Sequence, residues 1–416
     1  MRRVRWIAAQ LGALLLIVAC TPRGEGPEER AAFLARHWAD PLPAQGAVPS
    51  GFSSLEASLG PQSCGQCHPA QWASWQGSRH ARSVGPGLGW QLHLMDQAQG
   101  NRCLRCHAPL AEQKALLAQE LGWPARPATP PPAHVPPDLA HQGLVCAACH
   151  VRGHRRYGPP PASAASGAGA PSGVSVAESA AASHGGFEAS TAFSDSAFCA
   201  HCHQFPDDGP RTAGKLHEDT YRQWQASPAA ARETCQSCHM PQRRHLWLGI
   251  HDAETTRRAI DLDWQLVGHP GRAFGAVVTV RNVGAGHHFP TYMVPKVELH
   301  IAHLSPEGRR TELGRGVIGW TVDTDLRHEV ADTRIPAGGE RRFDLPLSLP
   351  ATASGLLELR VRVRPGEHYE RTFVQSLARA ERLPPAALPE LRAALQQVRD
   401  AEYDLMRVTR PLPVAP

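Results

Sequence analysis

Residue types that usually fill a protein core are scarce in this sequence. Aromatic residues, which include five Tyr, make up only 6% of the 416 residues, and Met occurs only five times. A chain of this length has room for roughly two to three domains, so the shortage implies that something other than ordinary side-chain packing fills part of the core. No basic run or face stands out, which argues against nucleic acid as a partner.

The N-terminal segment has the pattern of an export signal. Three arginines precede an apolar run that is too short to favour a permanent membrane span. The run ends at Ala19 and Cys20 in a sequence that resembles a bacterial lipobox. We therefore expect residues 1–19 to be a lipoprotein signal peptide and Cys20 to carry a lipid anchor; a plain signal peptide is the alternative. Thr21 after Cys20 predicts the outer membrane of a Gram-negative cell, on its periplasmic or surface face.

The other ten cysteines form five C-x-x-C pairs, and His follows each pair directly. The motifs are Cys64-Gly-Gln-Cys67-His68, Cys103-Leu-Arg-Cys106-His107, Cys146-Ala-Ala-Cys149-His150, Cys199-Ala-His-Cys202-His203 and Cys235-Gln-Ser-Cys238-His239. A lone C-x-x-C also fits a zinc knuckle or a redox dithiol. Because only 23 of 416 residues are His, the chance of His behind all five pairs is below about one in a million. The motifs predict five covalently bound haem c groups, with the thiols on the haem vinyls and the next His on the iron.

Each haem iron needs a sixth ligand or keeps an open site. The five proximal residues leave eighteen His, whereas Met is rare, so two imidazoles per iron and low potentials are expected. A surface or hydrogen-bonded imidazole is the alternative for most of the eighteen. Position near a motif favours His80, His184, His245 and His251.

The chain divides into regions of different composition, and we predict an α + β multidomain fold. A tether at 20–55 leads to a pentahaem domain of helices and loops at 56–258, then a β-sandwich at 262–376 and a C-terminal helix at 384–410. Within the haem domain, residues 159–186 contain 24 Pro, Ala, Ser or Gly out of 28, a composition typical of a flexible insertion.

The sandwich prediction rests on alternating patterns. In Leu356–Arg364, four apolar residues alternate with four charged residues, which predicts one buried and one solvent-facing side. Further strands are predicted over 276–282, 297–304 and 343–349. The glycine-rich loop 282–291 either presents His287 to a neighbouring haem or is a turn with exposed His.

Several motifs and their flanks resemble the multihaem cytochromes c related to hydroxylamine oxidoreductase and its tetrahaem electron-acceptor cytochrome. The matching pieces include Trp75-x-x-Ser78-x-His80-Ala81, Cys106-His107-Ala-Pro-Leu110, Gly143-Leu-Val-Cys146, His203-Gln-Phe205, Trp224-x-x-Ser227, His239-Met-Pro241 and Gly286-His287-x-Phe289-Pro290-Thr291. The resemblance covers most of residues 60–300. It implies closely stacked haems that pass electrons along a wire. It also implies His80, His184, His251 and His287 as distal ligands, with His245 as a fifth, and leaves their pairing with haems open.

The sequence departs from the enzymes of that family. The hydroxylamine oxidoreductases have more haems and a tyrosine cross-linked to the catalytic haem, and the five tyrosines here include no evident equivalent. The nitrite-reductase relatives replace one proximal His with Lys, whereas all five motifs here end in His. The leading hypothesis is therefore electron transfer without a catalytic residue. The alternative is an oxidoreductase that acts on a small nitrogen or sulfur compound at one five-coordinate haem.

Charge predicts the kind of redox partner. The formal charge is +5, and loss of Arg2, Arg3 and Arg5 with the signal peptide leaves +2. About ten haem propionates add about −10, and each of five ferric haems adds about +1. The holo-protein would therefore carry about −3 when oxidised and about −8 when reduced. We therefore expect electron donors and acceptors with a basic docking patch, and binding that weakens with salt.

Overall fold

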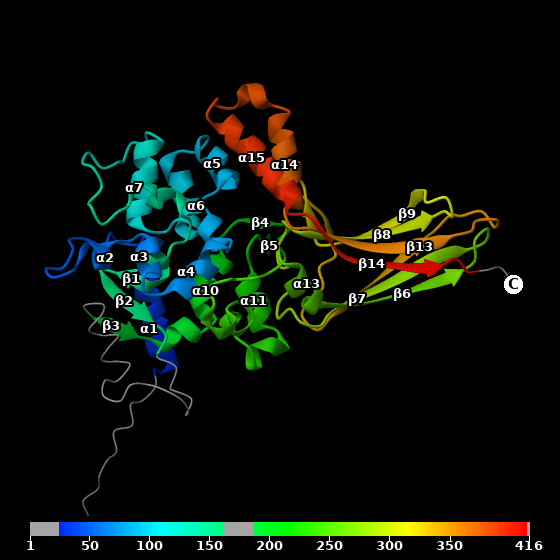
Figure 1. Ribbon diagram of the computed structural model, residues 1–416, viewed down its shortest axis with the longest axis horizontal. Coiled ribbons are helices and arrows are strands. Elements are labelled where there is room, and N and C mark those ends of the chain that lie inside the picture. Colours follow the sequence, from blue (N-terminus) through cyan, green and yellow to red (C-terminus); the bar gives the residue numbers. More distant parts are fainter. Residues whose placement is uncertain (1–24, 161–185, 414–416) are drawn as a thin grey trace, which may run out of the picture.

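The computed structural model describes residues 25–160 and 186–413. Short helices form one end of an elongated molecule and a β-sandwich forms the other, with a hairpin of helices α14 (Glu367–Leu377) and α15 (Ala387–Asp400) beside the junction (Figure 1). The predicted signal peptide, Cys20, His184 and most of the predicted insertion lie outside the described residues. Across the ranges described, no helix combines the length and apolar character needed to cross a membrane.

The helical end consists of short elements because caps and prolines interrupt it. Helix α6, for example, begins with a capping box. The Asp96 side chain accepts a hydrogen bond from the Gln99 amide, and the Gln99 side chain accepts one from the Asp96 amide. The elements are α1 (Pro27–His37), α2 (Ser54–Ala57), α3 (Pro61–Gly65), α4 (Pro69–Gln76), η1 (His80–Arg82), α5 (Pro86–Leu92), α6 (Gln97–His107), α7 (Ala111–Glu120), η2 (Pro137–His141), α8 (Cys146–His150), β1 (Val151–Arg152), β2 (Arg155–Gly158), β3 (Phe187–Ala189), η3 (Thr191–Ser194), α10 (Ala197–His203), β4 (Arg211–Thr212), β5 (Lys215–Leu216), α11 (Thr220–Gln225), η4 (Pro228–Ala231), α12 (Cys235–His239), η5 (Pro241–Arg243) and α13 (Ala253–Ala259).

The predicted tether at 20–55 differs from the structure, because helix α1 docks on the helical end. His37 in α1 is 3% exposed, and its ring bonds to the Cys149 carbonyl oxygen at 2.7 Å. Phe33 stacks on His37 with ring centroids 4.9 Å apart. These apolar and hydrogen-bonding contacts stabilise the segment against the third motif, so it is part of the folded body.

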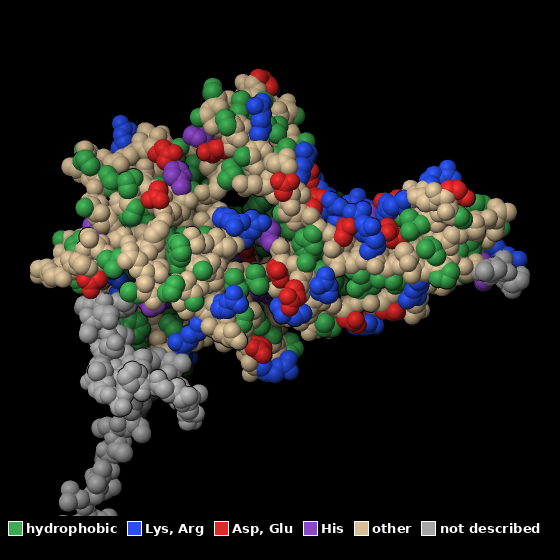
Figure 2. Space-filling view, in the orientation of Figure 1, with side chains coloured by type: hydrophobic (Ala, Val, Ile, Leu, Met, Phe, Trp, Pro, Cys, Tyr) green, Lys and Arg blue, Asp and Glu red, His purple; other side chains and the backbone are tan. Residues whose placement is uncertain are grey.

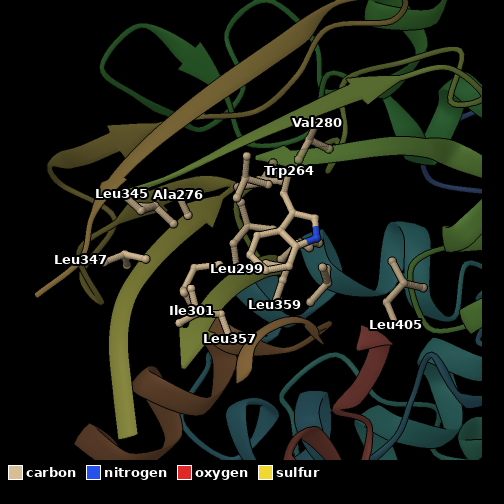
Figure 3. Close-up of a cluster of buried hydrophobic side chains, with 14 of the residues drawn as sticks. Trp264, Ala276, Val280, Leu299, Ile301, Leu345, Leu347, Leu357, Leu359 and Leu405 are labelled. Carbon is tan, nitrogen blue, oxygen red and sulfur yellow. The ribbon is translucent and has the colours of Figure 1, made fainter. Parts of the chain in front are cut away.

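Two antiparallel sheets enclose the core of the sandwich. One sheet has the strand order β14-β13-β8-β9 and the other β12-β7-β6. Their inner side chains form one apolar cluster (Figure 3), in which Leu299 and Leu359 are fully buried. The strands are β6 (Ile260–Gly268), β7 (Phe274–Asn282), β8 (Lys296–Leu304), β9 (Arg310–Ile318), β12 (Glu340–Pro346), β13 (Leu356–Arg364) and β14 (Tyr403–Pro411), with a separate hairpin of β10 (Trp320–Val322) and β11 (Glu329–Asp332).

The outer side of β13 is less exposed than its alternating pattern predicts. Its inward-facing apolar residues, Leu357 to Val363, are fully buried as expected, but Glu358 is also only 4% exposed. Arg310 on β9 donates to the Glu358 carboxylate at 2.9 Å, and Arg364 bridges Glu298 on β8 and Glu402 next to β14. Charged side chains from neighbouring strands thus cover this face in a connected ion-pair network.

The C-terminal region differs from the helix predicted over 384–410. Helix α15 ends at Asp400, and residues 403–411 form strand β14 along the free edge of β13. Leu405 of β14 packs into the sandwich core and is 4% exposed. Helix α14 was also not expected within the predicted sandwich at 262–376. Tertiary contacts with the edge of β13 and with the face of α5 determine the secondary structure of these segments.

Candidate functional site

Each C-x-x-C-H motif lies on or directly after a short helix. Helices α6, α8, α10 and α12 end at the motif His, and α3 contains the first Cys of the first motif. Residues three and four apart lie on one helix face, so this local structure turns both thiols and the imidazole to the same side. None of the described cysteines forms a disulfide.

Four of the five motifs open onto one large internal cavity of about 2380 Å³. Ligand pockets are usually about 300 to 1,000 Å³, so this space has room for several ligands of that size. The cysteines and histidines of the first, third, fourth and fifth motifs line it. On the face in Figure 2, a recess opens beneath the lobe of α14 and α15, with basic and His side chains at its rim.

Three motif histidines each face a histidine from a distant segment. Two metal–imidazole bonds of about 2 Å, plus roughly 1.1 Å from each nitrogen to its ring centre, separate the ring centres of axial ligands by about 6.2 Å. The observed centroid separations match this value. The pairs are His80 with His203 at 6.3 Å, His150 with His245 at 6.2 Å, and His239 with His287 at 6.3 Å.

Hydrogen bonds fix the tautomer of most of these rings. The Nδ1 atoms of His150, His239 and His287 lie 2.8, 2.6 and 2.8 Å from backbone carbonyl oxygens, to which they must donate. This leaves the Nε2 lone pair for a metal, the usual arrangement of ligating histidines. Burial lowers the pKa of His150 and of His287 to about 4, so both rings are neutral at pH 7. The residues fit axial ligation of haem iron.

The loop that holds His287 is pinned to helix α11. The Gln223 side chain accepts hydrogen bonds from the His288 amide at 3.1 Å and from the Thr291 hydroxyl at 3.0 Å. A side chain at Gly286 would place its Cβ 2.9 Å from the Cβ of Ala229, so glycine permits the close approach. The sandwich loop therefore brings the His287 ring to 6.3 Å from the ring of His239 in the fifth motif.

His80 and His251, two of the predicted distal ligands, have different surroundings. His80 packs edge-on against Trp247, with ring centroids 4.3 Å apart, and burial lowers its pKa to about 3. His251 instead accepts a hydrogen bond on Nδ1 from Arg79 at 2.5 Å. A neutral His251 ring in this contact carries its proton on Nε2, so the observed geometry does not present that nitrogen to a metal.

Contacts between thiols show which motifs are neighbours. Cys64 lies within hydrogen-bonding reach of Cys146, which joins the first and third motifs. In the fourth motif, Cys199 reaches Cys235 of the fifth and Cys202 reaches Cys106 of the second. Cys202 of the fourth motif also interacts electrostatically with Cys149 of the third motif. These interactions connect all five motifs in one group, with the fourth motif at its centre.

Comparison with known proteins indicates the fold. No protein-family model and no curated protein matches the chain. Among solved structures, the penta-heme cytochrome c552 from Thermochromatium tepidum aligns with 86% of this chain and 100% of its own, at a TM-score of 0.55 and 17% identity. A structural-genomics target, SoR45, aligns with 25% of this chain and 70% of its own, at a TM-score of 0.15 and 14% identity, too low to indicate a common fold. The chain thus shares the fold of a multihaem cytochrome c.

Sequence reasoning missed several side chains beside the motifs. His201, within the fourth motif, stacks on Trp38 with ring centroids 4.8 Å apart. Tyr369 interacts electrostatically with the Cys103 thiol of the second motif and with Glu218. Helical spacing offered one signal, because Tyr369 lies four residues before buried Phe373 on α14. No sequence pattern connected α14 with the haem motifs.

Proposed function

We propose that this chain is a pentahaem c-type cytochrome that relays single electrons between redox partners outside the cytoplasm. The observation that carries the proposal is the set of three imidazole pairs at 6.2 to 6.3 Å, each containing one motif histidine. Two imidazoles saturate a haem iron and suit it to electron transfer without substrate binding. On this proposal, His80, His245 and His287 are distal ligands of the fourth, third and fifth haems.

The connected attachment sites support a relay. A haem bound to each motif would lie beside at least one other, because thiols of different motifs already touch. The contacts run from the first motif through the third to the fourth, and from there to the second and fifth. Electrons that enter at one haem would reach the others without a mobile carrier. His184 and His251 are further proposed ligands. The hydrogen bond from Arg79 to His251 Nδ1 disfavours ligation by His251.

The proposed relay operates in the periplasm or at the outer membrane. Export is needed because haem c is attached outside the cytoplasm, and the lipobox-like sequence at Cys20 supports a lipid anchor. Cys20→Ser should abolish labelling by a palmitate analogue and release the exported holo-protein from the membrane fraction. Retention of both label and membrane association in that variant would contradict the anchor.

The haem content and its spin state test the central proposal. The full-length chain, produced together with a haem-maturation system, should contain five haems by pyridine haemochrome. Low-temperature EPR should then assign at least three of them as low-spin with two imidazole ligands, unchanged by cyanide. Fewer than five covalent haems, or mainly high-spin iron, would refute the relay.

A haem-dependent oxidoreductase is the second candidate, and one observation favours it. None of the ring pairs that join two histidines in the described residues includes His107. On this alternative, a haem on the second motif with an open axial position would bind the small nitrogen or sulfur compound. Cyanide binding to one haem in five would favour this function.

A further inference from the structure

One indole lies between two of the proposed distal ligands. The ring of Trp247 packs edge-on against His80, with ring centroids 4.3 Å apart and 86° between the ring planes. The same indole packs edge-on against His245, at 5.1 Å and 87°. All three side chains line the large cavity. Because the proposed function assigns His80 to the fourth haem and His245 to the third, one side chain contacts the ligands of two different haems.

The backbone of Trp247 has a conformation that bulky residues rarely adopt. Its φ is 45°, in the left-handed region, where a Cβ atom is crowded and glycine is favoured. A residue other than glycine keeps this conformation where surrounding contacts hold it, and such residues are concentrated at functional sites. The backbone oxygen of the next residue, Leu248, accepts a hydrogen bond from His239 Nδ1 at 2.6 Å. The turn therefore contacts three proposed ligands, two through the indole and His239 through the Leu248 carbonyl.

The orientation of the His80 ring depends on this indole more than that of His245 does. His245 Nδ1 lies 3.0 Å from the Arg243 carbonyl oxygen, and the His245 amide donates to the Ser74 hydroxyl at 3.0 Å. By contrast, His80 Nδ1 is buried and has no hydrogen-bond partner in the described part of the chain. The His80 backbone is fixed, because its oxygen accepts from the Leu144 amide at 2.8 Å, but no hydrogen bond from a described residue fixes its ring. Packing against the indole is therefore what orients this imidazole.

We propose that Trp247 is a positioning residue that sets the orientation of the His80 imidazole as an axial ligand of the fourth haem. The inference rests on the proposed function, because it requires His80 to be a ligand. The angle between the two axial imidazole planes influences the g-anisotropy of a low-spin ferric haem. That angle is 66° for His80 and His203 but only 10° for His239 and His287. The fourth and fifth haems should therefore give different EPR signals, and a change in one ligand can be assigned to its haem.

Low-temperature EPR of Trp247→Gly tests the proposal in the full holo-protein. Glycine adopts a positive φ without strain, so the turn and the Leu248 carbonyl should stay in place while the indole is lost. The signal of the fourth haem, about one fifth of the low-spin intensity, should shift in g value or become high-spin. The signals of the third and fifth haems should stay unchanged, because hydrogen bonds hold His245 and His239. Trp247→Phe keeps an aromatic ring and should restore most of the wild-type spectrum.

Gln242→Gly is the matched control in the same segment. Gln242 also has a left-handed backbone, with φ 56°, but its side chain is exposed, so this variant should have the wild-type spectrum. An unchanged spectrum in Trp247→Gly would overturn the inference. So would the same change in Gln242→Gly, or an equal change at the third, fourth and fifth haems, because either result would mean a general loss of packing.

Two further results separate the inference from maturation and from the proposed function. If Trp247→Gly holds fewer than five haems by pyridine haemochrome, Trp247→Leu decides the question, because leucine keeps apolar bulk but has no ring. A wild-type spectrum in Trp247→Leu would overturn the inference, and a change confined to the fourth haem would support it. Fewer than five haems, or mainly high-spin iron, in the wild-type protein would instead overturn the proposed function.

Discussion

Replacing His287 with alanine tests the delivery of a ligand by the β-sandwich. Its ring lies 6.3 Å from that of His239, with only 10° between the ring planes, so His287→Ala should leave one iron with a single imidazole. One haem in five changes, and about one fifth of the total iron should become high-spin. The rest of the loop should keep its structure, because Asn282 donates to the backbone oxygen of residue 287 at 2.8 Å.

Quantitative EPR of the oxidised holo-protein measures the high-spin fraction. His288→Ala is the matched control in the same loop, since its amide and not its ring contacts Gln223, and it should leave all low-spin signals unchanged. An unaltered high-spin fraction in His287→Ala would refute axial ligation by this residue. An increase well above one fifth would refute the argument that backbone contacts hold the loop.

Three further predictions concern stability, local geometry and partner binding. Burial alone would raise the pKa of Glu298, but hydrogen bonds from His300 and Arg364 outweigh it and lower the pKa to about 2 from an ordinary 4.5. Glu298→Gln should therefore lower the unfolding free energy by about 2 to 3 kcal/mol at pH 7. This loss of stability should become smaller as pH falls from about 4.5 towards 2. A loss in urea titrations that does not change with pH would contradict the pairing of Glu298 with His300 and Arg364. Gly143 has φ +65°, and an added Cβ would lie 2.4 Å from the His80 backbone oxygen. Gly143→Ala should therefore displace His80 and raise the high-spin fraction in EPR. An unchanged spectrum would show that this contact does not position the His80 ring. Electron exchange with a basic redox partner should slow as ionic strength rises, and stopped-flow rates independent of salt would exclude electrostatic docking.

The sequence predicted the elements whose signals are local. The spacing of Cys and His predicts haem attachment without any tertiary information, and this stays a prediction. Alternation in Leu356–Arg364 identified β13 with its fully buried side. Strand β14 escaped prediction because Leu405 alone among its residues is buried. Its strand structure depends on the edge of β13, which is distant in sequence.

Pairing of imidazoles could not be predicted from the chain alone. His80 and His203 belong to segments separated by two other motifs, and their approach follows from how those segments pack around the cavity. His251 had a favourable sequence position, yet its Nδ1 atom contacts Arg79. Sequence position near a motif therefore selects candidates, whereas the direction of the ring nitrogens separates them.

The sandwich is joined to the helical end at two separate places, which favours a role within the site over that of an independent docking module. The loop after β7 carries His287 to the fifth motif, where its ring lies 6.3 Å from that of His239. At the far end of the chain, the Tyr403 hydroxyl at the start of β14 donates to the Ile250 carbonyl oxygen at 2.9 Å and lies 2.8 Å from the Thr256 hydroxyl. Since β14 pairs with β13 inside the same sheet, the two connections constrain the sandwich from both ends of its sequence. This constraint holds the sandwich loop against the cavity. A stable pair between His287 and His239 requires that the loop stay in this position.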